Sequence, residues 1–166
     1  MAMARADEAL VILLGHASRD VVFAAAGALV NVGADPLCRA ALTTSSDGPN
    51  GCALLVRQVR RAGTSDLALA TVASQALYNA LSPFAASQAS GHVAACEDAF
   101  WSLQLLHDSL EELLEVTDPE DEHGAEFATA GGALHRLTES LLQQRQRSER
   151  ASEYEELEDP IGHGHK

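Results

Sequence analysis

The sequence predicts an all-α protein, and both its composition and the spacing of its apolar residues support this prediction. Alanine (30) and leucine (23) supply 53 of the 166 residues, whereas aromatic residues make up only 4%. Side chains that are small or unbranched at Cβ favour helices over pleated sheets. With 46% hydrophobic residues, the chain is one domain in size and has enough apolar material for a core, which excludes disorder of the whole chain.

Five helices are expected in the first half of the chain, because apolar residues recur there at helical spacing between capping and turn-forming residues. The first is expected at residues 6–14, the second from a cap at Ser18 or Asp20 to about Gly33, and the third from Asp35-Pro36 to about Leu42. The fourth is expected at residues 52–62, and the fifth from a cap at residues 64–66 to Leu81, ahead of Pro83. The run TTSSDGPNG at residues 43–51 concentrates turn formers and predicts a loop.

The second half is expected to contain a linker, two helices and a tail. Small residues at 82–91 indicate the linker, and residues 93–116 form the longest predicted helix, which Thr117-Asp118-Pro119 ends. A last helix is expected from Ala125 to about Arg150, and the charged tail from Ser148 is expected to fray. The apolar stripes of the two helices consist of Phe100, Leu103, Leu106, Leu110, Leu113 and Leu114, and of Phe127, Ala130, Leu134, Leu137 and Leu141.

A repeat relates two of the expected helices and predicts how the helices stack. AGALVNV at residues 26–32 aligns with SQALYNA at 74–80 at an offset of 48 residues, which places Leu29 on Leu77 and Asn31 on Asn79. LVILL at residues 10–14 aligns with the segment that starts at Leu55, at an offset of 45 residues. Repeats of about this length are typical of stacked helical solenoids. We therefore expect Leu29 and Leu77 to be buried core residues of a solenoid rather than of a closed bundle.

The order of these segments resembles the armadillo repeat: a short helix after Asp-Pro, a loop, a Leu-Leu-Val helix, and a long helix that ends in Ala-Leu-x-Asn. More narrowly, AAGALVNVGADPLCRAAL and GTSDLALATVASQALYNAL are similar to the C-terminal repeats of the armadillo repeat-containing protein 2 family, over about residues 10–81. The predicted organisation is an armadillo-like α-solenoid fragment at 5–81, the linker at 82–91, a divergent C-terminal helical pair at 92–147 and an acidic polar tail at 148–166.

What the resemblance implies about function goes beyond what composition or spacing can indicate. That family is associated with cilia and flagella, so the resemblance implies a protein-interaction scaffold or adaptor of the axoneme, linked to radial spokes and intraflagellar transport. The alternative is a generic armadillo interaction module elsewhere in the cytoplasm, such as a subunit of a transport or cytoskeletal scaffold. A shared fold does not by itself decide between these two roles.

The net charge of −13 is carried by the second half of the chain. Residues 1–80 hold six basic and six acidic side chains, whereas residues 81–166 hold five basic and eighteen acidic ones. An acidic surface repels the phosphate backbone, so nucleic acid is a poor partner, and proteins with basic surfaces within a large assembly are expected instead. No apolar run reaches the roughly 18 to 20 residues of a membrane span, so no membrane insertion is expected.

Two asparagines, one tryptophan and one acidic helix face are the candidate partner-binding residues. Asn31 and Asn79 lie where some armadillo proteins use an asparagine to hold the backbone of an extended peptide, because one amide both donates and accepts. The alternative is that each satisfies a local carbonyl. Trp101 is either an interface anchor or a core residue. The acidic face, which is expected to meet Lys or Arg and mainly to raise the association rate, consists of Asp108, Glu111, Glu112 and Glu115.

No catalytic, cofactor or metal site is expected. The sequence has no recognisable Ser/His/Asp or Cys/His grouping and no phosphate-binding glycine loop, which predicts a protein without enzymatic activity. The acidic run at 118–126 lacks the glycine and the closing glutamate of a calcium loop. The histidines are expected to be isolated: His107 and His135 as surface or boundary side chains, His163 and His165 as tail residues without further ligands. The three cysteines, Cys38, Cys52 and Cys96, are expected to be buried and reduced.

An apolar edge is expected at the N-terminal end of the array, because the first helix pair lacks the short leading helix of its own repeat. This edge is expected to consist of Val11, Leu14, Val21 and Val22. An upstream segment of the same polypeptide, or another subunit, would cover it, and the isolated chain would self-associate.

Overall fold

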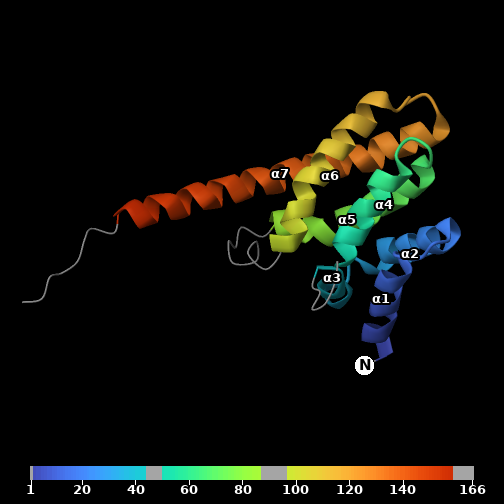
Figure 1. The fold of residues 1–166 in the computed structure, drawn as a ribbon, viewed down its shortest axis with the longest axis horizontal. Helices are drawn as coiled ribbons and strands as arrows, with labels where there is room; N and C mark the ends of the chain where they lie inside the picture. Colours follow the sequence, from blue (N-terminus) through green and yellow to red (C-terminus); the bar gives the residue numbers. More distant parts are fainter. Residues whose placement is uncertain (1, 44–49, 87–96, 159–166) are drawn as a thin grey trace, which may run out of the picture.

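The computed structural model describes residues 2–43, 50–86 and 97–158, and all regular structure in these ranges is helical (Figure 1). The helices are α1 (Ala2–Leu13), α2 (Arg19–Val32), α3 (Pro36–Thr43), α4 (Gly51–Ala62), α5 (Leu67–Ala86), α6 (Glu97–Val116) and α7 (Glu122–Glu158). The all-α prediction is confirmed for these ranges. None of the described helices combines the length and the apolar character that a membrane span requires.

Side-chain caps set the starts of α4 and α5. Asn50 Oδ1 accepts a hydrogen bond from the backbone amide of Ala53 at 2.8 Å, and Asp66 Oδ1 accepts one from Leu69 at 3.1 Å. These bonds satisfy amide groups that have no partner inside the helix. Asp66 is one of the three caps that the sequence offers for α5. Ser18 occupies the N-cap position of α2 but makes no capping hydrogen bond through its side chain.

The predicted end of the fifth helix at Leu81 is wrong, because α5 continues through Pro83 to Ala86. Residues 82–86 of the predicted linker are therefore helical, and residues 87–91 lie outside the described ranges. Packing explains the extension: Phe84 and Ala85 are partly buried against the core. Pro83 cannot donate to the carbonyl of Asn79 and its ring crowds that carbonyl, and the contacts of the last turn offset this cost.

The last helix is longer than predicted at both ends, since α7 spans 37 residues where 125 to about 150 was expected. It, and not the helix at 93–116, is the longest described helix; α6 is described only from Glu97. The first part of the predicted frayed tail, residues 148–158, is helical, and 159–166 lie outside the described ranges. No glycine or proline interrupts residues 133–159, and Arg145 donates to Glu149 one turn later at 2.7 Å.

α5 is the helix around which the others are arranged, since it packs against α2, α4 and α7. α6 packs against α4 and α7, and α1 packs against α2 and α3. The second half of the chain therefore lies directly on the first, with α7 on α5 and α6 on α4, and the C-terminal part of α7 extends beyond the other helices (Figure 1).

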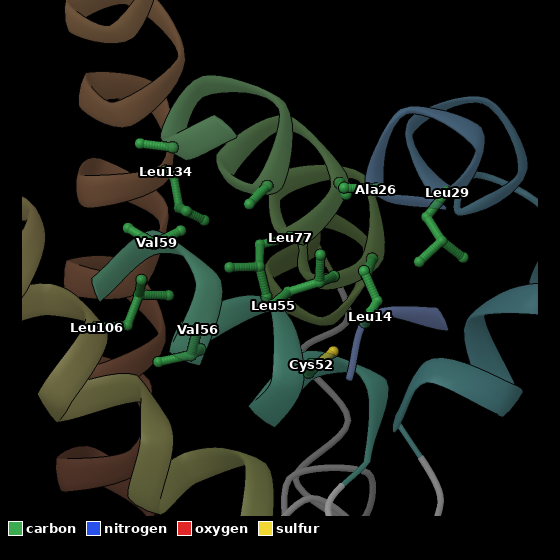
Figure 2. Close-up of a cluster of buried hydrophobic side chains, with 14 of the residues drawn as sticks. Leu14, Ala26, Leu29, Cys52, Leu55, Val56, Val59, Leu77, Leu106 and Leu134 are labelled. Carbon is green, nitrogen blue, oxygen red and sulfur yellow. The ribbon is translucent and has the colours of Figure 1, made fainter. Parts of the chain in front are cut away.

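One continuous cluster of buried apolar side chains joins the two halves. Figure 2 shows Leu55 and Leu77 in the middle of this cluster, with Leu29 towards α2 and Leu106 and Leu134 towards α6 and α7. Leu29 and Leu77 are both 0% exposed, so their predicted burial is confirmed. The predicted stripes are confirmed at Leu103, Leu106, Leu110, Leu113, Phe127, Leu134 and Leu141, which are all buried, whereas the side chain of Phe100 lies outside the described part.

Three side-chain amides each join one helix to the end of another. Gln58 on α4 donates to the Leu14 carbonyl just after α1, and Asn79 on α5 donates to the Val30 carbonyl in the last turn of α2, both at 2.8 Å. Gln144 on α7 donates to the Ala85 carbonyl in the last turn of α5 at 3.1 Å. The last carbonyls of a helix have no partner within it, so each bond satisfies an otherwise open acceptor. We call Gln58, Asn79 and Gln144 the amide caps.

The prediction that Val11, Leu14, Val21 and Val22 form an uncovered apolar edge is wrong. Leu14 and Val22 are buried in the cluster shared with α4 and α5, and Val11 and Val21 are half-buried. The helices that follow in the chain cover this side, which sequence spacing alone did not indicate. The large apolar side chains that α1 and α3 do expose include Ile12, which is 74% exposed, and Leu37, which is 76% exposed.

The described cysteines are buried, as expected, and Cys96 lies outside the described ranges. Cys38 on α3 donates from Sγ to Asp7 Oδ1 on α1 at 3.1 Å. This hydrogen bond to a carboxylate, together with burial, raises the pKa of Cys38 to about 11. The thiol therefore stays protonated and unreactive at neutral pH.

Candidate partner-binding groove

An open groove runs along α5 between α2 and α7. Its floor is one face of α5, where positions 68, 71, 72, 75, 78 and 79 follow one another at helical spacing. Its walls are the exposed flanks of α2 and α7, and its volume is about 720 Å³. The lining residues are Phe23 and Val30 from α2, Ala68, Thr71, Val72, Gln75, Tyr78 and Asn79 from α5, and Glu126, Thr129, Ala130 and Ala133 from α7.

The exposed surface of the groove is mostly apolar. Its floor extends from Ala68 to Asn79, which corresponds to about 16 Å along the helix axis. Ala68 in the floor and Ala130 and Ala133 in the α7 wall are the smallest lining side chains, and the larger Phe23 and Tyr78 belong to α2 and to the end of the floor. A groove with a mostly apolar surface and some polar groups is the usual form of a binding site.

Glu126 is the single charged residue among those that line the groove. It is exposed, and its Oε2 lies 3.7 Å from Nδ1 of His123. No Lys or Arg is among the lining residues, so Glu126 supplies the only formal charge of the lining itself.

An ion pair next to the groove fixes the start of α2 against the start of α5. The Arg19 guanidinium donates two hydrogen bonds of 2.8 Å to the carboxylate of Asp66. Its cationic carbon also lies 4.7 Å from the centre of the Phe23 ring, within reach of a cation–π interaction. The hydrogen bonds from Arg19 lower the pKa of Asp66, which keeps the carboxylate ionised while it caps α5.

The two predicted asparagines have different surroundings. Asn31 is exposed, does not line the groove, and donates to the Gly27 carbonyl of its own helix at 3.3 Å. Asn79 lines the groove, but its amide nitrogen is used by the Val30 carbonyl. Both nitrogens thus satisfy carbonyls within the chain, which is the alternative that the sequence left open. A role of either residue in partner binding stays a prediction.

The acidic face lies elsewhere on the molecule. Its four residues, Asp108, Glu111, Glu112 and Glu115, are all exposed on α6, and none of them lines the groove. Gln104 donates to Asp108 Oδ1 at 2.8 Å. Trp101 belongs to the same helix, but its side chain lies outside the described part. The predicted site residues are therefore not brought together in one site.

Most of the groove was not predicted from the sequence. Its floor was detectable in principle, because one face of α5 carries Thr71, Gln75 and Tyr78 instead of leucine. Its α7 wall was not detectable, because Glu126 and Thr129 are about fifty residues away from the floor in the chain and no local pattern pairs α7 with α5.

His107 and His135 are also not the isolated side chains that the sequence suggested. Their rings stack between α6 and α7, with centroids 4.3 Å apart. His107 Nδ1 lies 3.2 Å from Thr138 Oγ1. Within the described ranges, no group of three or more His, Cys, Asp or Glu side chains is arranged to hold a metal ion. His163 and His165 lie outside those ranges.

Comparison of the chain with models of protein families, with curated proteins and with solved structures finds no match. The groove is therefore interpreted from its own residues.

Proposed function

We propose that the protein is a non-enzymatic interaction module that binds a segment of another protein in the groove along α5. The observation that carries this proposal is the groove itself, which is open, mostly apolar and about 720 Å³ in volume. Sites of this kind bind apolar side chains, with a few polar groups fixing the orientation. The groove residues Gln75, Tyr78 and Glu126 can serve that purpose.

The arrangement of the helices supports an armadillo-like stack as the scaffold of the groove. The pairs α1–α2, α4–α5 and α6–α7 follow one another, with contacts from α2 to α5 and on to α7. α3 takes the place of the short leading helix of the second unit. The amide caps Asn79 and Gln144 each join the long helix of one unit to that of the next. In such stacks each unit buries its apolar face against its neighbours.

The proposed place of this module is the ciliary or flagellar axoneme, in the handling of radial spoke components together with intraflagellar transport. The support for this is the resemblance of residues 10–81 to the armadillo repeat-containing protein 2 family. The second candidate is a cytoplasmic transport or cytoskeletal scaffold subunit, which the groove supports equally. The acidic face on α6 adds a surface that attracts basic partners and accelerates association. Neutralising its four carboxylates should slow association and flatten its salt dependence.

The proposal is tested by a substitution that fills the groove with a large side chain. Thr129 is exposed and lines the groove, so Thr129→Trp places a large ring in it without disturbing the core. Ala151→Trp is the matched control, since Ala151 is exposed on the same helix and does not line the groove. Both variants and the unmodified chain are used to capture partners from ciliated cells, with identification by mass spectrometry.

We expect Thr129→Trp to lose a set of partners that Ala151→Trp retains. Axonemal proteins in that set support the first role, and transport or cytoskeletal proteins support the second. Identical partners for all three chains would show that the groove is not the binding site.

A further inference from the structure

The groove is poorly equipped to hold an extended peptide, because such a peptide needs partners for its backbone. About 16 Å of groove would hold about five extended residues, which carry about ten backbone N–H and C=O groups. Six lining side chains can form hydrogen bonds: Thr71, Gln75, Tyr78, Asn79, Glu126 and Thr129. Groups that lose water against apolar walls without a new partner cost free energy.

Half of those six side chains are already engaged or buried. The Asn79 amide donates to Val30, and Thr129 Oγ1 donates to the Ala125 carbonyl at 3.0 Å. Thr71 is only 7% exposed and its hydroxyl oxygen is out of contact with solvent. Gln75 is then the one lining amide with no hydrogen bond inside the described chain. The backbone groups on the open side of such a peptide stay in water, but Gln75, Tyr78 and Glu126 offer few partners for those that face the walls.

A helical segment has no such requirement, because its backbone groups are bonded within the helix. The shape of the groove also suits a helix. Its floor is a helix and its walls are two helices, and about 16 Å is the length of three helical turns. Small side chains at Ala68, Ala130 and Ala133 leave room for larger apolar side chains of a partner and permit a close approach of its axis.

Charge defines one further feature of the partner. Glu126 is the single charged lining residue, and no basic lining residue accompanies it. A partner helix with a Lys or Arg over Glu126 would pair with it, whereas an acidic helix would be repelled by a chain of net charge −13.

We infer that the groove binds an amphipathic helix of another protein, with apolar residues at i, i+3 or i+4 and i+7 and a Lys or Arg beside Glu126. This inference rests on the proposed function and specifies the partner of the same groove.

The test is an unbiased selection of 16-residue peptides from a random displayed library on the full-length chain. We expect the enriched peptides to carry apolar residues three and four apart with one Lys or Arg, and the tightest to become helical when bound, by circular dichroism. A proline at the centre of the tightest-binding peptide should weaken its binding to the chain by more than about a hundredfold, since proline inside a helix costs about 3 kcal/mol. Glu126→Gln should weaken it by about two- to fivefold.

The variants separate the two proposals. Thr129→Trp should abolish binding of the selected peptide and Ala151→Trp should leave it unchanged. Peptides with apolar residues at every second position, tolerant of proline and blocked by Thr129→Trp, would overturn the helical partner and keep the groove. An enriched peptide that Thr129→Trp does not affect, or a selection that enriches none, would overturn the groove as well.

Discussion

The amide cap Asn79 offers a sharp test of how the helices are joined, because the chain contains its own control. Asn79 and Asn31 are equivalent in the repeat alignment, and both are helical. Asn79 bonds a carbonyl of another helix at 2.8 Å and is part-buried, whereas Asn31 is exposed and bonds its own helix at 3.3 Å. Substitution by alanine raises helix propensity at both positions, but less at Asn31, in the last turn of α2, than at Asn79, inside α5, so the gain cancels only in part.

The expected difference follows from the bond that is lost. Asn79→Ala removes a hydrogen bond between helices and leaves the Val30 carbonyl at the end of α2 without it, which should cost about 1 to 2 kcal/mol relative to Asn31→Ala. For a chain of this length that corresponds to a difference in Tm of about 2 to 8 °C. Thermal and urea unfolding of both variants measure it, and hydrogen exchange should show faster opening of the end of α2 in Asn79→Ala alone. Equal stabilities for the two variants would refute the proposed role of the amide cap.

Three further predictions concern the core and the ion pair. Leu77→Ala should lower the free energy of unfolding by about 2 to 5 kcal/mol, whereas Leu105→Ala, at a side chain 41% exposed, should cost far less; similar denaturation midpoints for the two would contradict the assigned core. Ser74 is fully buried and its hydroxyl has no hydrogen-bond partner among the described residues, so Ser74→Ala should raise the free energy of unfolding by about 1 kcal/mol in urea titration. A loss would show that the hydroxyl is satisfied. Because Arg19 lowers the pKa of Asp66 below its ordinary value, their pairing should stabilise the fold at neutral pH, and this stabilisation should be lost as the pH falls through the folded pKa of Asp66. The Arg19→Gln variant should therefore be less stable than the parent at pH 7 and equally stable in acid. A difference in stability that does not depend on pH would contradict this.

The features that sequence predicted well are those set by neighbouring residues. Alanine and leucine content indicated the fold class, and the spacing of apolar residues identified buried positions on several helices, including Leu29 and Leu77. Thr117-Asp118-Pro119 was recognised as a helix end, and α6 ends at Val116. In each case the deciding interaction lies within a few residues of the chain.

The features that were not predicted from the sequence depend on contacts between distant segments. Pro83 looked like a helix end, but packing of Phe84 and Ala85 extends α5 past it. The groove needs α7 beside α5, and the stacking of His107 on His135 needs α6 beside α7. No property of a single helix predicts either neighbour. The carbonyl that Asn79 bonds was not predicted for the same reason, because it is 49 residues away.

The most direct test of the account is to map where the selected helical peptide touches the full-length chain, by NMR chemical-shift changes of backbone amides and side-chain methyls. We predict changes concentrated at the groove, at Thr71, Val72, Gln75, Ala130 and Ala133, with the α6 residues Asp108 to Glu115 unaffected in high salt. Changes confined to α6, with the groove residues unmoved, would contradict a binding groove along α5.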